Sequence, residues 1–286
     1  MAGESVHVER TGGVVLITLD DPPTRNALSP DMAVELAAEL DRFEADSKDR
    51  VLVITGKDPS FCSGANVRRF ERAIEEHESD DAVQGSPLPW DDIEARLSAY
   101  PIDARQAPPG SVSDLPLRVS EVQKPTIAAV NGHAIGVGLG LALSCDVRVA
   151  SERAEFAEAF VRMGLVPGDG SSWQLPRLIG LGNTFYMQYT GDRIDAAEAY
   201  RINLVSKVYP HDELMGSAME LASRLAHGAT YAMSLTKYLA HKSWGMDFKD
   251  SLRLAQTAQE LARRSDDHKE AVKAFLEKRE PRFQGR

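Results

Sequence analysis

Cysteine is scarce in this chain, and long apolar runs are missing from it. The two cysteines, Cys62 and Cys145, are too few for a disulfide framework and fit a reducing compartment. The seven histidines are scattered outside any Cys/His cluster, which argues against a metal site. Apolar runs such as residues 14–17 are too short to span a membrane, and the first twenty residues lack a signal-peptide pattern. We therefore expect a cytoplasmic protein without a metal ion.

Basic residues are also fewer than acidic ones. The 286 residues include 33 lysines and arginines against 43 aspartates and glutamates, which gives a formal net charge of -10. An acidic protein repels the phosphate backbone, so we expect no nucleic-acid partner. The hydrophobic share of 43% and the charged share of 27% are ordinary for a globular protein. The length suffices for one large α/β domain with a full core.

The hydrophobic pattern predicts alternating strands and helices. Two strand-like runs at 6–9 and 14–19 flank a Thr-Gly-Gly hairpin signal, and Ser29-Pro30 is typical of the start of a helix that continues to about Phe43. The remaining predicted strands are 51–55, 126–130, 147–150 and 204–208, with a loop at 56–64. The remaining predicted helices are 136–144, 212–227, 230–243, 247–264 and 267–279. This order predicts an α/β core over 1–210 and a helical C-terminal region over 211–286.

Residues 77–120 differ from the rest of the chain. They contain six prolines and two acidic pairs, and their only helical pattern is a short one at 90–97. Such a length without regular structure is unusual for a connector and indicates an inserted flap or lid. A plain surface loop explains the composition equally well, and the sequence leaves both interpretations open.

Two glycine-containing segments could bind an anion through the backbone. Residues 61–67 follow a strand and loop, and Gly64 there allows a ligand to approach the backbone closely. Residues 131–140 join a buried strand to a buried helix through three alternating glycines. Unpaired N–H groups at a helix start suit an oxyanion. A tight turn and close helix packing explain each segment alone, and the glycine spacing does not fit a dinucleotide site.

A third segment, residues 164–173, holds Asp169 between two glycines before a helical stretch. An aspartate in such a turn can simply cap the next helix. The functional interpretation is a carboxylate base in a mostly apolar pocket, where desolvation raises the pKa of the carboxyl toward a useful range.

Taken together, these segments resemble the crotonase, or enoyl-CoA hydratase/isomerase, superfamily. Each segment alone is weak evidence for the family. The ordered set at these spacings is specific evidence, and it covers nearly the whole chain. The matching segments are 25–28 (Arg-Asn-Ala-Leu), 61–67, 124–132, 145–146 (Cys-Asp), 164–170 and 267–279. Residues 77–120 look like a longer version of the variable segment of the family.

The resemblance implies an α/β fold, a crotonase-like spiral of repeated ββα units with a C-terminal helical extension that forms homotrimers or dimers of trimers. It implies an acyl-CoA thioester as substrate, with coenzyme A as part of the substrate and no covalently bound cofactor. By motif position, the N–H groups of Ala65 and Val137 form an oxyanion hole. Substrate and CoA contacts fall on Arg25, Asn26, Ala27, Leu28, Gly64, Asn66, Gly136, Phe275 and Lys278. For the last two, a solvated amphipathic helix is the safer interpretation.

Two departures from the family pattern narrow the expected chemistry. Hydratases of the family use two glutamates, and the matching positions hold Gly140 and Phe160, so hydration by that pair is not expected. Glu158 lies two residues from the second position and would need a register shift to substitute. Asp169 is then the best remaining base, because isomerases and a β-diketone C–C hydrolase of the superfamily have an aspartate in a similar loop. We therefore expect double-bond isomerisation with Asp169 as the base.

Two alternatives stay open at this point. A hydrolase or lyase of β-dicarbonyl substrates would need a second polar group, such as His133 or an acidic residue of the insertion. A relative that binds acyl-CoA without catalysis would explain the missing glutamates.

Overall fold

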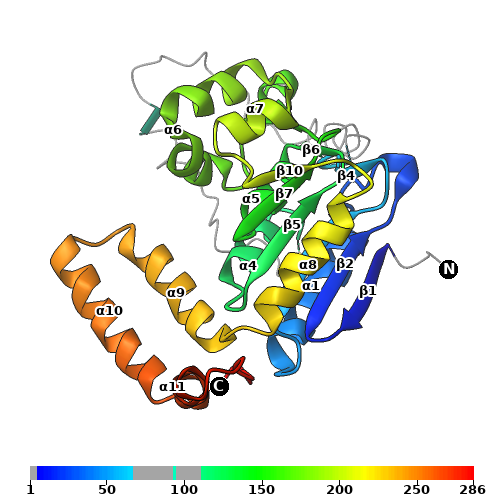
Figure 1. Cartoon of the computed structure of the whole chain (residues 1–286). Coiled ribbons are helices and arrows are strands. Elements are labelled where there is room, and N and C mark those ends of the chain that lie inside the picture. The colour runs from blue at the N-terminus through cyan, green and yellow to red at the C-terminus, as the bar shows by residue number, and fades with distance from the viewer. Residues whose placement is uncertain (1–4, 67–92, 95–110) are drawn as a thin grey trace.

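The computed structural model describes residues 5–66, 93–94 and 111–286, and a six-stranded sheet forms its centre (Figure 1). The strand order is β1-β2-β3-β5-β7-β10. Its strands are β1 (Val6–Thr11), β2 (Val14–Leu19), β3 (Val51–Gly56), β5 (Thr126–Val130), β7 (Val147–Ser151) and β10 (Lys207–Tyr209). The hairpin β1–β2 is antiparallel, and the other neighbours are parallel.

A smaller sheet has the order β4-β6-β8-β9. Its strands are β4 (Ser60–Cys62), β6 (His133–Ile135), β8 (Glu155–Ala157) and β9 (Ile194–Asp195). Consecutive strands alternate between the two sheets, since β3 precedes β4, β5 precedes β6 and β7 precedes β8. This alternation confirms the predicted spiral of ββα units. The predicted loop at 56–64 was wrong because β4 forms inside it, and a strand of three buried residues leaves no alternating pattern.

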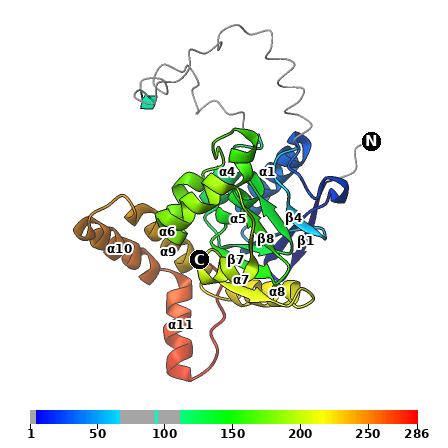
Figure 2. The same ribbon diagram turned by 90° about the horizontal axis from the view of Figure 1, so that it is seen from above.

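Helices cover both faces of the large sheet (Figures 1 and 2). They are α1 (Pro30–Ala45), α4 (Leu115–Glu121), α5 (Val137–Leu143), α6 (Ser171–Thr190), α7 (Ala196–Arg201) and α8 (Leu214–Ala226). The main core lies between one face of the sheet and α1, α4 and α5. On the other face, Leu214 and Ala218 of α8 pack against Val53 and Ile127. Strands buried on both faces explain the continuous apolar run at 51–54.

The last three helices form a C-terminal arm that projects from the core (Figure 1). They are α9 (Thr230–Ser243), α10 (Phe248–Arg263) and α11 (Asp266–Glu277). The Arg50 guanidinium, just before β3, donates hydrogen bonds to the carbonyls of Gly228 at 2.8 Å and Phe283 at 3.1 Å. This cation joins the start of the arm to the end of the chain.

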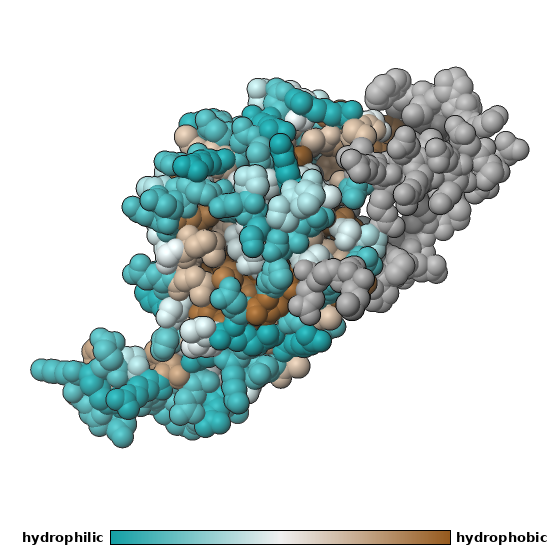
Figure 3. Space-filling view, turned by 90° about the vertical axis from the view of Figure 1, so that its right-hand side faces the viewer, coloured by the Kyte–Doolittle hydropathy of each residue, from teal (hydrophilic) through white to brown (hydrophobic). Residues whose placement is uncertain are grey.

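Apolar residues gather in the middle of one face of the molecule, between polar ones (Figure 3). Most of the predicted insertion at 77–120, including the helix at 90–97 apart from 93–94, lies outside the described residues, and the end of the insertion forms α4. No helix of the described residues is long and apolar enough to cross a membrane.

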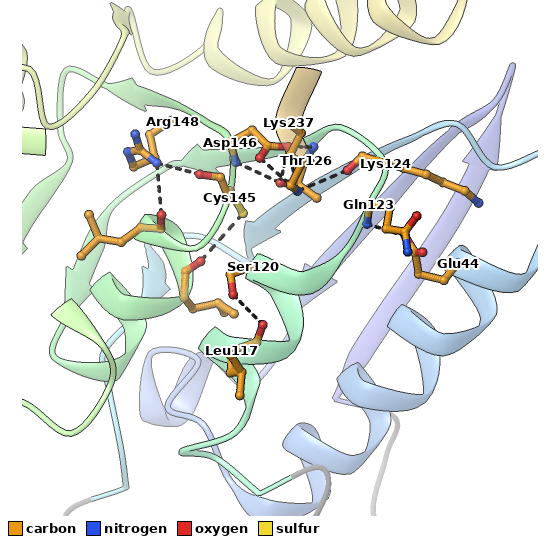
Figure 4. A network of polar contacts seen from close by, with 12 residues as sticks. Glu44, Leu117, Ser120, Gln123, Lys124, Thr126, Cys145, Asp146, Arg148 and Lys237 are labelled. Carbon is orange, nitrogen blue, oxygen red and sulfur yellow. Dashed lines mark hydrogen bonds and ion pairs between the residues drawn. The ribbon is translucent and has the colours of Figure 1, made fainter. Parts of the chain in front are cut away.

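A network of polar contacts fixes the end of α5 (Figure 4). The buried Arg148 side chain donates hydrogen bonds to the carbonyls of Cys145 at 2.7 Å, Leu204 at 2.8 Å and Leu143 at 3.3 Å. Burial lowers the pKa of the Arg148 guanidinium. One buried cation therefore binds the carbonyl of Leu143, the last residue of α5, and that of Cys145 just beyond the helix, and joins them to the carbonyl of Leu204.

We predict that Arg148→Leu lowers the free energy of unfolding by about 3 kcal/mol, because three buried carbonyls lose their donor. Arg201→Leu is the matched control, since that exposed guanidinium bonds Glu198 on its own helix, and we expect no resolvable change. Urea denaturation followed by circular dichroism at equal protein concentration measures both. Equal effects of the two changes would contradict the prediction.

Candidate active site

Two backbone turns meet where β4 and β6 end. These strands pair in parallel, with Cys62 opposite Ala134, so the chain leaves both at the same edge of the small sheet. Gly64 then packs directly on the backbone of the other turn: a Cβ atom there would lie 2.8 Å from the carbonyl oxygen of Ile135. Its φ of +102° also favours glycine. The Gly64 turn therefore lies against the segment that leads into α5.

The first candidate oxyanion donor is the N–H group of Ala65. The carbonyl of Gly64 accepts a hydrogen bond from the N–H of Leu28 at 2.8 Å. In a trans peptide, the N–H group points away from the carbonyl of the same peptide unit. The N–H of Ala65 therefore points away from Leu28, in a direction fixed by that hydrogen bond.

The second candidate donor is the N–H group of Val137, the first residue of α5. The preceding carbonyl, of Gly136, accepts a hydrogen bond from the N–H of Gly140 at 3.0 Å, along the helix. The Val137 N–H therefore points out of the N-terminal end of α5, where it has no intrahelical acceptor. The Val137 side chain is buried in the main core, so valine at this position does not remove the donor.

Asp169 lies just before α6, and the residue is 3% exposed. Its Oδ1 accepts a hydrogen bond from the N–H of Ser171 at 3.1 Å, whereas its Oδ2 is buried with no partner among the described residues. Burial raises the pKa of this carboxyl above the ordinary value for aspartate. The N-cap residue of α6 is Gly170, so capping does not account for the free oxygen of Asp169.

Gly140 makes room for the Asp169 carboxylate. A Cβ atom on Gly140 would lie 2.6 Å from Oδ2 of Asp169 and 2.8 Å from its Cγ. Gly140 follows Val137 by three residues, which is about 5 Å along the axis of α5. The carboxylate therefore lies about one helical turn from the N–H group of Val137. It occupies the space that a side chain at position 140 would need.

Glu158 also belongs to the candidate site, although the sequence analysis did not select it as a catalytic residue. It is fully buried, and its Oε2 accepts a hydrogen bond from the Ser171 hydroxyl at 2.9 Å. Its Oε1 has no partner among the described residues. Burial, with a further contribution from the charge of Asp169, raises its pKa well above the ordinary value for glutamate. The signal that could have found it is a single acidic residue inside the otherwise apolar stretch 156–161.

A cavity of about 940 Å³ opens beside Asp169. Residues of α4, α5, α6 and α9 line it, together with the Gly168–Gly170 turn, and its walls are mostly apolar. The Trp173 and Trp244 rings lie in this wall with centroids 4.9 Å apart. Among the described residues predicted to be catalytic, Asp169 alone is part of the wall, so the cavity meets the candidate site at that carboxylate.

The model of the enoyl-CoA hydratase/isomerase family matches residues 9–89 and 90–286. The chain belongs to this family. It is 32% identical over 285 residues to the crotonyl-CoA hydratase of Syntrophomonas wolfei, covering 99% of both proteins. It is 31% identical over 280 residues to the 1,2-epoxyphenylacetyl-CoA isomerase of Escherichia coli, covering 98% of this chain and 97% of that one. The structure of enoyl-CoA hydratase subunit I from Geobacillus kaustophilus superposes with a TM-score of 0.82, at 35% identity and 99% coverage of both chains.

In this member of the enoyl-CoA hydratase/isomerase family, the segment predicted to contact CoA borders the Gly64–Ala65 turn. Arg25 is exposed, whereas Ala27 and Leu28 are buried. Asn26 is fully buried, and its Nδ2 donates hydrogen bonds to the carbonyls of Ser60 at 2.6 Å and Lys57 at 2.8 Å. The side chain of Asn26 therefore holds the segment against β4. Its contact with CoA stays a prediction, as do those of Gly64, Asn66 and Gly136 beside the turns.

Three other candidate residues do not line the cavity beside Asp169. Phe275 is 83% exposed on α11, and Lys278 follows that helix, at the end of the arm remote from α5 and α6 (Figures 1 and 2). His133 contacts Ser60 of β4 at 3.4 Å and Glu155 of β8 at 3.2 Å. Among the described residues, no three His, Cys, Asp or Glu side chains gather as metal ligands.

We predict that Gly140→Ala lowers the free energy of unfolding by about 2 kcal/mol, because its methyl group overlaps the Asp169 carboxylate and overpacks the site. Gly182→Ala is the control, since nothing lies within 4 Å of a Cβ at that position of α6, and the better helix propensity of alanine leaves stability equal or higher. Chemical denaturation of both variants measures the difference. A stability of Gly140→Ala equal to that of the control would contradict the overlap.

Proposed function

We propose that this chain shifts a carbon–carbon double bond within an acyl-CoA thioester by proton transfer. The observation that carries the proposal is the buried Asp169 carboxylate. Its Oδ2 has no partner in the described part of the chain and lies about one helical turn from the N–H of Val137. Family membership supports an acyl-CoA substrate, and the 1,2-epoxyphenylacetyl-CoA isomerase of Escherichia coli among the relatives supports isomerisation of a CoA thioester, in that protein of an epoxide.

In this mechanism, the N–H groups of Ala65 and Val137 hold the thioester oxygen of a 3-enoyl-CoA. Asp169 takes a proton from C2, the electron pair of that C–H bond moves into a dienolate, and the oxygen gains negative charge. Asp169 then returns the proton at C4, which leaves the double bond between C2 and C3. Each oxyanion donor lowers the barrier by about 3 kcal/mol, because it is strongest when the charge has formed.

The CoA moiety runs past residues 25–28 in this proposal, with the exposed Arg25 side chain near a phosphate. Gly64, Asn66 and Gly136 border the thioester. Phe275 lies at the far end of the arm of its own chain, so it would contact the CoA bound to another copy.

A lyase or hydrolase of β-dicarbonyl thioesters is the second candidate. Activation of water needs another polar group beside the base, and the observation that favours this candidate is the Glu158 carboxyl, which shares Ser171 with Asp169. The isomerase is the better-supported proposal because one base suffices for it, and Asp169 alone of the two lines the cavity.

We predict that Asp169→Asn lowers turnover of a 3-enoyl-CoA at least about 100-fold, because the base is lost, while acyl-CoA binding is retained. The conjugated-thioester absorbance measures turnover, and calorimetry measures binding.

The control is Asp195→Asn at the N-cap of α7, where asparagine caps equally well and turnover should not change. Normal turnover of Asp169→Asn would overturn the catalytic assignment. A wild-type protein that binds acyl-CoA but converts neither an enoyl nor a β-dicarbonyl thioester would be a non-catalytic relative.

The C-terminal arm supports a homotrimer or a dimer of trimers. Phe248 and Phe275 are each 83% exposed, and Leu276 is 75% exposed, on helices that project from the core. Apolar side chains on such an arm are typical of a surface that another subunit covers.

We predict a solution mass of three or six times the 31.3 kDa of the chain, because association buries these side chains. Light scattering after size exclusion, over a range of protein concentrations, measures it. A mass of one chain at all concentrations would contradict the prediction.

A further inference from the structure

Ser171 connects two buried carboxyl groups by two different donors. Its N–H donates a hydrogen bond to Oδ1 of Asp169 at 3.1 Å, and its hydroxyl donates one to Oε2 of Glu158 at 2.9 Å. The second oxygen of each carboxyl is buried and has no partner within residues 5–66, 93–94 and 111–286. Two unpaired anions so close together and away from water would be strongly unfavourable.

The charged groups on the surrounding elements are engaged elsewhere. On the 3-10 helix η4 (Ala159–Met163), Arg162 pairs with Asp192 at 2.6 Å. On β8, Glu155 pairs with His133 at 3.2 Å and Arg193 at 2.9 Å. On α6, Arg177 stacks over the ring of Trp173, and α5 has no charged residue.

Within the described part of the chain, therefore, no cation stabilises either of the two carboxyls. The two groups share Ser171 as a hydrogen-bond donor, and the charge of Asp169 acts on Glu158, so the protonation of Glu158 depends on that of Asp169.

We propose that Glu158 and Asp169 hold one proton between them, that Glu158 keeps it, and that Glu158 thereby positions Asp169 as the ionised base. This inference rests on the proposed function. Glu158 does not line the cavity, whereas Asp169 does, so Glu158 acts through Asp169 and does not touch the substrate.

The asymmetry of the pair decides which group keeps the proton. Glu158 is the more deeply buried, and burial together with the charge of Asp169 raises its pKa well above the ordinary value. The pKa of Asp169 is also raised by burial, but hydrogen bonds from Ser171 oppose the rise. Asp169 therefore ionises first as pH increases, while Glu158 is still neutral.

The pair predicts a bell-shaped pH dependence of kcat/KM. Activity falls as pH decreases through the raised pKa of Asp169, because the base becomes protonated. Activity falls again as pH increases through the higher pKa of Glu158, because a second buried anion then repels the first and competes for Ser171. In each reaction cycle, the substrate proton moves from C2 to Asp169 and on to C4, and the proton of Glu158 stays in place.

Glu158→Gln tests this role because glutamine mimics the neutral acid at every pH. We expect it to retain kcat/KM within about threefold of wild type at neutral pH, to keep the acidic limb and to lose the alkaline limb. Glu155→Gln, three residues earlier on β8, is the matched control and should leave both limbs in place. An alkaline limb that persists in Glu158→Gln would overturn the proposal. So would a folded Glu158→Gln protein that is inactive at all pH values, since Glu158 would then be the base itself.

Infrared difference spectroscopy locates the proton without relying on activity. At neutral pH we expect a protonated-carboxyl band that Glu158→Gln removes and that both Asp169→Asn and Glu155→Gln retain. A band that disappears in Asp169→Asn and persists in Glu158→Gln would place the proton on Asp169 and overturn the inference. If the band is as expected but Asp169→Asn turns over normally, the proposed function fails while the proton assignment stands.

Discussion

The candidate site depends on the direct approach of one backbone segment to another. Residues 56–64 and 132–138 pack so closely that a Cβ atom on Gly132 would lie 2.1 Å from the Pro59 carbonyl oxygen, and one on Gly138 would lie 2.4 Å from that of Cys62. Side chains cannot separate the segments, so the parallel pairing of β4 with β6 sets the distance between the two turns. The carbonyl of each turn is engaged in a hydrogen bond, and the N–H groups that follow are thereby held in fixed directions. Such preorganised donors need no rearrangement when charge develops.

The two carboxyl groups of the candidate site come from a different part of the chain than these two turns. Asp169 comes from the turn before α6, and Glu158 from the end of β8, yet both are held by Ser171 at the start of α6. The first turn of α6 therefore positions the two carboxyls of the candidate site, whereas the start of α5 and the Gly64–Ala65 turn position its candidate oxyanion donors. Arg148 donates a hydrogen bond to the carbonyl of Leu143 at the other end of α5, so a buried side chain holds the helix that carries Val137.

Much of the fold could be predicted from the sequence, because its long elements have clear patterns. The strand at 126–130 and the helix at 230–243 agree with the structure at both ends. The small sheet was missed, since strands of two or three residues have no measurable periodicity. At the site, motif order pointed to Ala65, Val137 and Asp169. Glu158 was not among the predicted catalytic residues, because motif matching compares positions along the chain. It does not detect side chains that reach the same point of the fold from different sequence positions.

The close fit between Gly140 and Asp169 has a consequence for how this sequence can diverge. A glutamate introduced at residue 140 would meet the Asp169 carboxylate within 3 Å of its own Cβ, so the two acids exclude one another. A single change at either position therefore passes through a protein that has two clashing carboxylates or neither carboxylate. The two positions are therefore expected to vary as a pair among descendants of this chain, and a gain of carboxylate at one should accompany its loss at the other.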